Sequence, residues 1–238
     1  MNSEFSLSNL LNQTLAELSD NARLIAIFCA ISIPITGISL LFEGGDDASF
    51  GFNMGFRITE SLMEQGIMAV FVIIAAAAVS VVLTFWLYAG MVRRTTALDF
   101  ARFWPWLGIY ILGSLGIGFG LILLIIPGII LLVRWMIILP LVIATPIAAM
   151  DTFGESWART RGHGWSIFGA LVILLIGMIV LSSILGVAMV SLGGVSSIPG
   201  MLLSAVADAL YSVVMVAFAV AAYRLLKDDR EMLAEVFE

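Results

Sequence analysis

Six apolar runs, each of about 18 residues or more, constrain what this chain can fold into. They cover residues 24–42, 67–89, 106–126, 129–149, 165–192 and 199–222. An apolar helix of this length can cross the hydrocarbon core of a bilayer. Of the 238 residues, 61% are hydrophobic and only 12% are charged, which is more apolar surface than one water-soluble core could bury. The sequence therefore predicts an all-α, polytopic transmembrane bundle of about six spans.

The polar stretches are too short to form a second domain. The longest, residues 43–65, has about 23 residues, too few for a core of its own. We expect a single integral membrane domain over residues 1–238, with an amphipathic segment at 1–23 and a polar tail at 223–238. Residues 1–22 contain no Lys or Arg, so the first span is expected to stay and not to be cleaved as a signal peptide.

Only Pro127-Gly128 separates the third apolar run from the fourth. One continuous helix through both runs would be about 66 Å long, twice the hydrocarbon thickness. The dipeptide therefore predicts a reversal. The same tripeptide, Ile-Pro-Gly, recurs at 198–200 between the last two runs. We expect three helical hairpins, each preceded by a surface segment.

The basic residues favour one orientation. Nine of the eleven Lys and Arg residues lie on one side of the predicted spans, namely Arg23, Arg93, Arg94, Arg102, Arg159, Arg161, Arg224, Lys227 and Arg230. The other side has Arg57 among the five acidic residues of the 43–66 connection. Because cytoplasmic loops are enriched in Lys and Arg, we expect both termini in the cytoplasm and the acidic connection outside.

Three segments on the predicted cytoplasmic side have the pattern of amphipathic helices that lie along the membrane surface. In the first, leucines recur at helical spacing on one face, and the polar residues Ser6, Asn9, Asn12, Gln13 and Glu17 occupy the other. The second, 93–104, ends in an aromatic cluster, and the third, 152–165, combines tryptophans with arginines. The alternative is that each segment is a linker or an extension of the next span.

Two charged residues lie within the predicted spans, Arg134 and Asp208. Charges inside a bilayer are costly and are usually paired within the protein. The two residues lie roughly 9 Å and 13 Å from their respective turns. An arginine side chain can span the difference in depth, so we predict an ion pair between them. Such a pair would act first of all as a structural clamp between the second and third hairpins, or else as a substrate or proton site. The alternative to a pair is snorkelling of Arg134 to the outer surface.

Other features of the spans favour packing. Gly116-x-x-x-Gly120 permits close approach of two helices, and Pro34 and Pro140 are expected to kink their spans. Between the fourth and fifth spans lie five residues suited to contact with lipid headgroups: Trp157, Arg159, Arg161, His163 and Trp165. The same arginines would also act as signals of membrane topology.

Part of the chain resembles a known family. The resemblance lies in Ile-Pro-Gly at 126–128, Arg134-Trp135, Pro140, Ser156-Trp157, Arg159-Thr160-Arg161-Gly162-His163, Trp165 and Ile167-Phe168-Gly169. These residues are similar to the glycerophosphoryl diester phosphodiesterase membrane-domain family, which includes bacterial inner-membrane proteins of about six spans. In fusions, this membrane part precedes a phosphodiesterase barrel of roughly 250 residues that uses His, Glu and Asp clusters. This chain has one His, so the resemblance implies a membrane module without a hydrolase.

Little in the composition points to chemistry. With one His and one Cys, no metal site or cofactor is expected, and neither a nucleophile elbow nor a basic nucleic-acid patch is found. We therefore expect no enzyme, but a scaffold, accessory subunit or membrane-organisation factor of the bacterial inner membrane. Its expected partners are membrane lipids, or a second membrane protein or complex, and no nucleic acid. The alternative is a transporter or lipid-handling protein with a site near Arg134 and Asp208.

Overall fold

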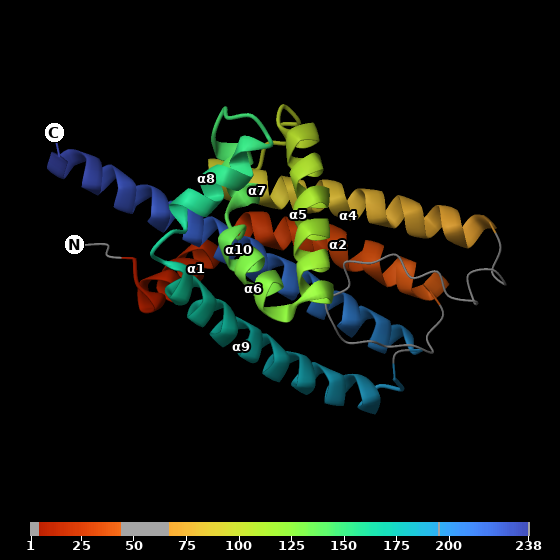
Figure 1. Ribbon diagram of the computed structural model, residues 1–238. Helices are drawn as coiled ribbons and strands as arrows, with labels where there is room; N and C mark the ends of the chain where they lie inside the picture. Colours follow the sequence, from red (N-terminus) through yellow and green to blue (C-terminus); the bar gives the residue numbers. More distant parts are fainter. Residues whose placement is uncertain (1–4, 44–66, 195, 238) are drawn as a thin grey trace. The chain divides into compact units, whose positions relative to one another are not determined.

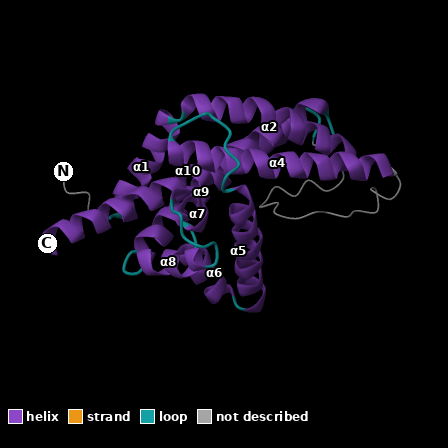
Figure 2. Cartoon of the chain, turned by 90° about the horizontal axis from the view of Figure 1, so that it is seen from above, coloured by secondary structure: helices purple, strands orange, loops and turns teal. Residues whose placement is uncertain are grey.

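The computed structural model describes residues 5–43, 67–194 and 196–237. Most of them are helical, and none of these residues forms a β-strand (Figure 2). The predicted all-α class is therefore confirmed. The acidic connection expected outside the membrane lies beyond the described residues, except for Glu43.

Six helical segments are long and apolar enough to cross a membrane. They are Ala22–Phe42 in α2 (Ala22–Glu43), α4 (Ile67–Arg93), α5 (Phe103–Leu123), the pair α6 (Ile125–Arg134) and α7 (Ile138–Ala144), α9 (Gly164–Ser191), and Ile198–Lys227 in α10 (Ile198–Phe237). Two shorter helices, α1 (Leu7–Asp20) and α8 (Asp151–Arg159), each precede a span. The chain is thus a multi-pass membrane protein, as its six apolar runs predict.

The chain forms two compact units, and four helices, α2, α4, α9 and α10, contribute residues to both. The first unit comprises Met1–Leu24, Phe85–Leu174 and Val213–Glu238, and the second comprises Ile25–Thr84 and Leu175–Ser212. In the first unit the core includes α7, which is buried at Leu141 and Val142, and residues 217–222 of α10, which are almost wholly inaccessible. All the side-chain contacts that build the candidate site described below belong to this first unit.

The sequence predicts that the chain reverses at Pro127-Gly128 between the third and fourth spans. In the structure the reversal lies three residues earlier, at Leu124. Leu124 alone is extended between α5 and α6, and Pro127 lies in the first turn of α6. Proline suits that turn because its missing N–H would have no partner inside the helix. Figure 1 shows α5 and α6 side by side after this tight reversal. Ile-Pro-Gly therefore opens the second helix of the hairpin.

In the last hairpin, too, Ile-Pro-Gly lies in the first turn of the second helix. α10 begins at Ile198, and the Ser197 hydroxyl accepts a hydrogen bond from the Gly200 N–H at 3.1 Å, which caps the helix. The chain reverses earlier, at Gly193 and Gly194, whose positive φ angles of 100° and 79° favour glycine.

Pro140 breaks the fourth span, as the sequence predicts. α6 ends at Arg134 and α7 begins at Ile138, because Pro140 cannot donate to the carbonyl four residues earlier and its ring crowds that carbonyl. The span ends at Ala144 and not at residue 149, since Thr145 precedes Pro146 and is extended. Pro34, in contrast, lies inside an unbroken α2.

The second predicted surface helix, 93–104, is absent, because residues 95–100 are irregular. Local hydrogen bonds replace the helix. The Ala97 N–H donates to the Thr95 hydroxyl, and the Ala101 N–H donates to the Asp99 carboxylate. The Asp99 carboxylate also pairs with Arg93. The bond from Ala101, and after it the bond from Arg93, lower the pKa of Asp99 below its ordinary value.

Glycines bring α5 close to α6 and to the break that follows it. A Cβ on Gly116 would lie 2.5 Å from the Trp135 ring, and a Cβ on Gly120 would lie 2.9 Å from the Gly128 Cα atom. No side chain fits at either position, and the packing interpretation of Gly116-x-x-x-Gly120 is confirmed.

Candidate functional site

The N-terminal helix α1 docks through a stripe that is largely polar. Leu10, Thr14, Glu17 and Asn21 are buried, and the Glu17 side chain has an exposed fraction of 0%. As one of the polar residues on the face opposite the leucines, Glu17 is expected to meet water, and that expectation is wrong. The residue lies one turn from Thr14 and Asn21, on the face that meets the rest of the unit.

Glu17 is buried because it has a full set of partners. The Arg224 Nε atom of α10 lies 3.0 Å from the Glu17 carboxylate. The side-chain amides of Gln13 and Asn21 each donate to that carboxylate at 3.2 Å. Arg224 also donates to the Met91 carbonyl of α4 at 2.7 Å. A buried charge is tolerated when it is paired and hydrogen-bonded in this way.

The helix α8 docks in the same manner, through small polar side chains. Thr152, Ser156 and Thr160 are each wholly buried. The Ser156 hydroxyl donates to the Arg134 carbonyl at 2.7 Å. The break between α6 and α7 frees carbonyl groups, and α8 supplies the donor for this one.

The Arg134 side chain completes this joint between α6 and α8. Its Nη1 atom donates to the Thr160 carbonyl at 2.6 Å, and its guanidinium carbon lies 5.4 Å from the centre of the Trp157 ring. Thr160 is the C-cap of α8. Arg134 thus places positive charge at the negative end of a helix dipole and stacks over an aromatic ring.

Two more arginines act on helix ends in this way. Arg102 donates to the carbonyl of Thr145, the C-cap of α7, and Arg224 donates to Met91 in the last turn of α4. No local sequence pattern predicts these contacts, because each arginine meets a carbonyl far away in the chain. Arg102 and Arg224, which are among the basic residues from which the orientation is predicted, therefore also hold helix ends of this unit.

The predicted pair of Arg134 and Asp208 is divided between the two units. Arg134 is half-buried against α8, and Asp208 is an exposed residue of α10 in the second unit. Their pairing stays a prediction.

Exchanging the two charges tests this pairing. If the pair forms, Arg134→Asp combined with Asp208→Arg restores the expression and thermal stability that either single neutralisation loses. If Arg134 acts only on α8, the exchange sets a carboxylate against the Thr160 carbonyl, and the double variant is worse than both single variants. Arg134→Lys is the control, because it keeps the charge and a donor in both cases.

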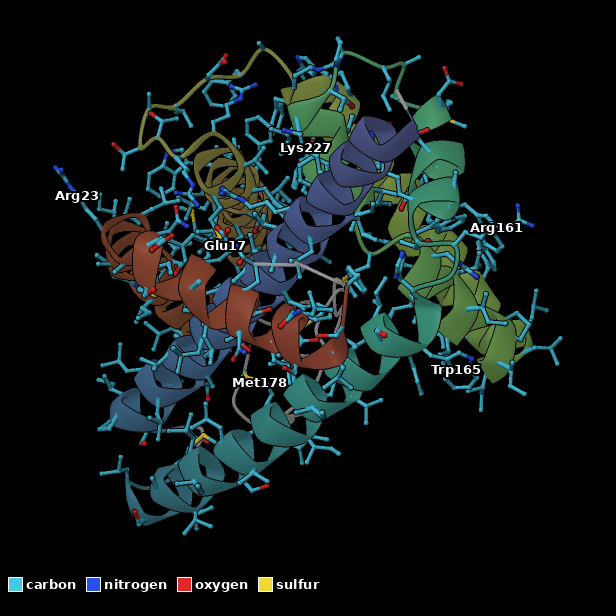
Figure 3. All side chains as sticks on the ribbon, turned by 90° about the vertical axis from the view of Figure 1, so that its left-hand side faces the viewer. Glu17, Arg23, Arg161, Trp165, Met178 and Lys227 are labelled. Atoms are coloured by element: carbon cyan, nitrogen blue, oxygen red, sulfur yellow. The ribbon has the colours of Figure 1, made fainter. Side chains whose placement is uncertain are left out.

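The residues predicted to meet lipid headgroups have different environments. Arg159 pairs with Glu155 at 2.6 Å, and the His163 ring lies 4.6 Å from the Phe5 ring. Arg161 is exposed, as are Trp157 (42%) and Trp165 (85%). Figure 3 shows Arg161 and Trp165 extending outward from the ribbon. Among the described residues, no group of three His, Cys, Asp or Glu side chains could hold a metal.

A family model covers most of this architecture. It is described as a domain of unknown function, DUF7847, and it matches residues 56–226. The chain belongs to this family. The match spans α4 to the end of the apolar part of α10, so the DUF7847 region includes Arg134, α8 and Arg224 but not α1. No curated protein and no solved structure matches the chain. The resemblance to the phosphodiesterase membrane domains stays a prediction.

Proposed function

We propose that this DUF7847 protein is a non-enzymatic scaffold of a bacterial inner membrane, which organises the lipids of the cytoplasmic leaflet through α1 and α8. The observation that carries the proposal is shared by both helices. Each one docks by buried polar side chains, and each precedes a span and leaves one large apolar side chain exposed, Leu15 in α1 and Trp157 in α8. Such side chains are stable at a membrane surface and costly in water.

The faces of α1 fit a helix lying in the headgroup layer. At about 100° per residue, Leu7, Leu18, Leu11 and Leu15 follow one another around one flank, next to the buried stripe. Leu15, at the outer edge of this flank, is 64% exposed. Ser8, Asn12 and Ser19 are exposed farther round the helix. One side thus contacts protein, one suits lipid and one suits water.

The orientation in this proposal rests on the arginines. Arginine side chains are enriched in cytoplasmic loops, so the ends of the spans that carry them belong on the cytoplasmic side. Both termini, α1 and α8 would then share one leaflet, with the acidic connection on the opposite side.

A transporter with a site at Arg134 and Asp208 is the competing proposal. In transporters, broken helices expose backbone groups that bind substrate. At the break in this chain, the Ser156 hydroxyl donates to the Arg134 carbonyl, and the Arg134 guanidinium donates to Thr160. These bonds within the protein favour a structural joint and so support the scaffold.

Fluorescence at two positions of α1 tests the scaffold. In a Cys29→Ala background, Leu15→Cys and Asn12→Cys are labelled separately with an environment-sensitive dye, and the full chain is reconstituted in vesicles. We expect a blue-shifted emission at position 15, quenched by shallow lipid-attached quenchers. The emission at position 12 should stay close to that of the dye in water. Equal emission at both positions would contradict the proposed orientation of α1.

Flux measurements on the same vesicles distinguish the competing proposal. The scaffold should alter the headgroup packing of the bilayer, reported by a polarity-sensitive membrane probe, without moving solutes. Adding Leu15→Asn and Trp157→Ala should remove that change in packing. A solute flux that Asp208→Asn abolishes would establish the transporter instead.

A further inference from the structure

We propose that the corner between α8 and α9, residues 155–165, binds the phosphate-bearing headgroup of an anionic phospholipid, with Arg161 as the residue that contacts it. The inference rests on the proposed function and names the lipid class for one of its two surface elements.

Six of the eight arginines whose side chains the structure describes are already engaged. Arg93, Arg94, Arg159 and Arg224 pair with carboxylates, and Arg102 and Arg134 donate to helix-end carbonyls. Arg23 and Arg161 are the described arginines that lack a hydrogen bond or ion pair, and both are exposed. A charge without a partner on the protein is available to a ligand.

The corner carries a net positive charge. Glu155 is the carboxylate residue of the corner, and Arg159 lies 2.6 Å from it. The charge of Arg161 therefore stays uncompensated within residues 155–165. A guanidinium binds a phosphate group through two parallel hydrogen bonds, so the complementary partner is an anion of this geometry.

The level of the corner in the membrane identifies the source of that anion. The 28 residues of α9 give a length of about 42 Å, more than the hydrocarbon core and close to the full bilayer with its headgroups. Trp165 is the second residue of α9 and is 85% exposed. Exposed tryptophan at the end of a span is typical of the headgroup layer, where lipid phosphates are concentrated.

Trp157 lies in α8, at the other end of the corner from Trp165. Its ring is 42% exposed, and Arg134 lies over it at 5.4 Å. The bonds of Ser156 and Arg134 fix α8 to the span, and Arg161 lies in the short turn between α8 and α9. A headgroup that binds there need not order a loose segment first.

Lipid retention by the full chain tests the assignment. The purified protein in mild detergent is offered equal amounts of phosphatidylglycerol and phosphatidylcholine with identical acyl chains, and bound lipids are counted by native mass spectrometry. We expect Arg161→Ala to lower the ratio of bound phosphatidylglycerol to phosphatidylcholine about fivefold, the effect of one basic residue near anionic lipid. Arg161→Lys should keep most of the preference, and Trp165→Ala should reduce it.

Two exposed residues provide matched controls. Arg23→Ala removes the other unpaired arginine, and Trp104→Ala removes a tryptophan that is 76% exposed beside the engaged Arg102. Both should leave the ratio unchanged. An unchanged ratio in Arg161→Ala, an equal loss in Arg23→Ala, or full displacement of the lipid by millimolar inorganic phosphate would overturn the site. The fluorescence at position 15 does not involve Arg161, so it separates a failure of this site from a failure of the scaffold.

Discussion

Glu17→Ala is expected to release α1 from the bundle. The substitution leaves Arg224 without its carboxylate and removes the acceptor of Gln13 and Asn21. Removing one member of a buried ion pair costs about 3–5 kcal/mol, because the remaining charge stays desolvated. We expect hydrogen exchange across α1 to accelerate by at least a hundredfold, which corresponds to about 2.7 kcal/mol, while the spans keep their protection.

Asp20→Ala is the matched control for this prediction. Asp20 is also an acid of α1 with an arginine partner, but its carboxylate lies 3.6 Å from Arg94 and both side chains are more than half exposed. An exposed ion pair contributes about 0–1 kcal/mol, so exchange in α1 should hardly change. A second variant, Glu17→Leu with Arg224→Met, should recover much of the docking, since apolar residues can replace a buried pair. Equal effects of Glu17→Ala and Asp20→Ala would refute the role of the pair.

Gly120→Ala is expected to force α5 and α6 apart. The added Cβ would lie 2.9 Å from the Gly128 Cα atom, and backbone cannot move aside as a flexible side chain can. Overpacking of this kind costs typically 1–3 kcal/mol. We expect a lower unfolding free energy, measured by titration with a denaturing detergent, and a larger loss for Gly120→Val.

Gly118→Ala, two residues away in the same helix, is the control. A Cβ there meets nothing within 4 Å. Alanine is favoured over glycine inside a helix by about 0.8–1.0 kcal/mol in water, so this variant should be neutral or slightly more stable. If both alanine variants unfold alike, the close approach of the two helices does not limit stability.

The candidate site was predictable only in part. Arg134, Trp157 and Arg161 stand out in the sequence because charged or amphipathic side chains are unusual beside long apolar runs. Their partners do not stand out, because Thr160 and Ser156 contact Arg134 through a carbonyl and a hydroxyl that any sequence offers. Glu17 was missed for a related reason. A carboxylate on an amphipathic helix normally faces water, and only Arg224, more than 200 residues later, makes its burial favourable.

The sequence by itself determined that the apolar segments lie in lipid and that they are helical. Runs of about 20 apolar residues must satisfy their backbone hydrogen bonds internally in hydrocarbon, so their number and approximate bounds follow from length alone. The tertiary structure decided where each reversal occurs, that residues 95–100 are irregular, and which faces of α1 and α8 are buried. These outcomes depend on hydrogen bonds and close contacts between residues distant in the chain, whose energies do not appear in any local pattern.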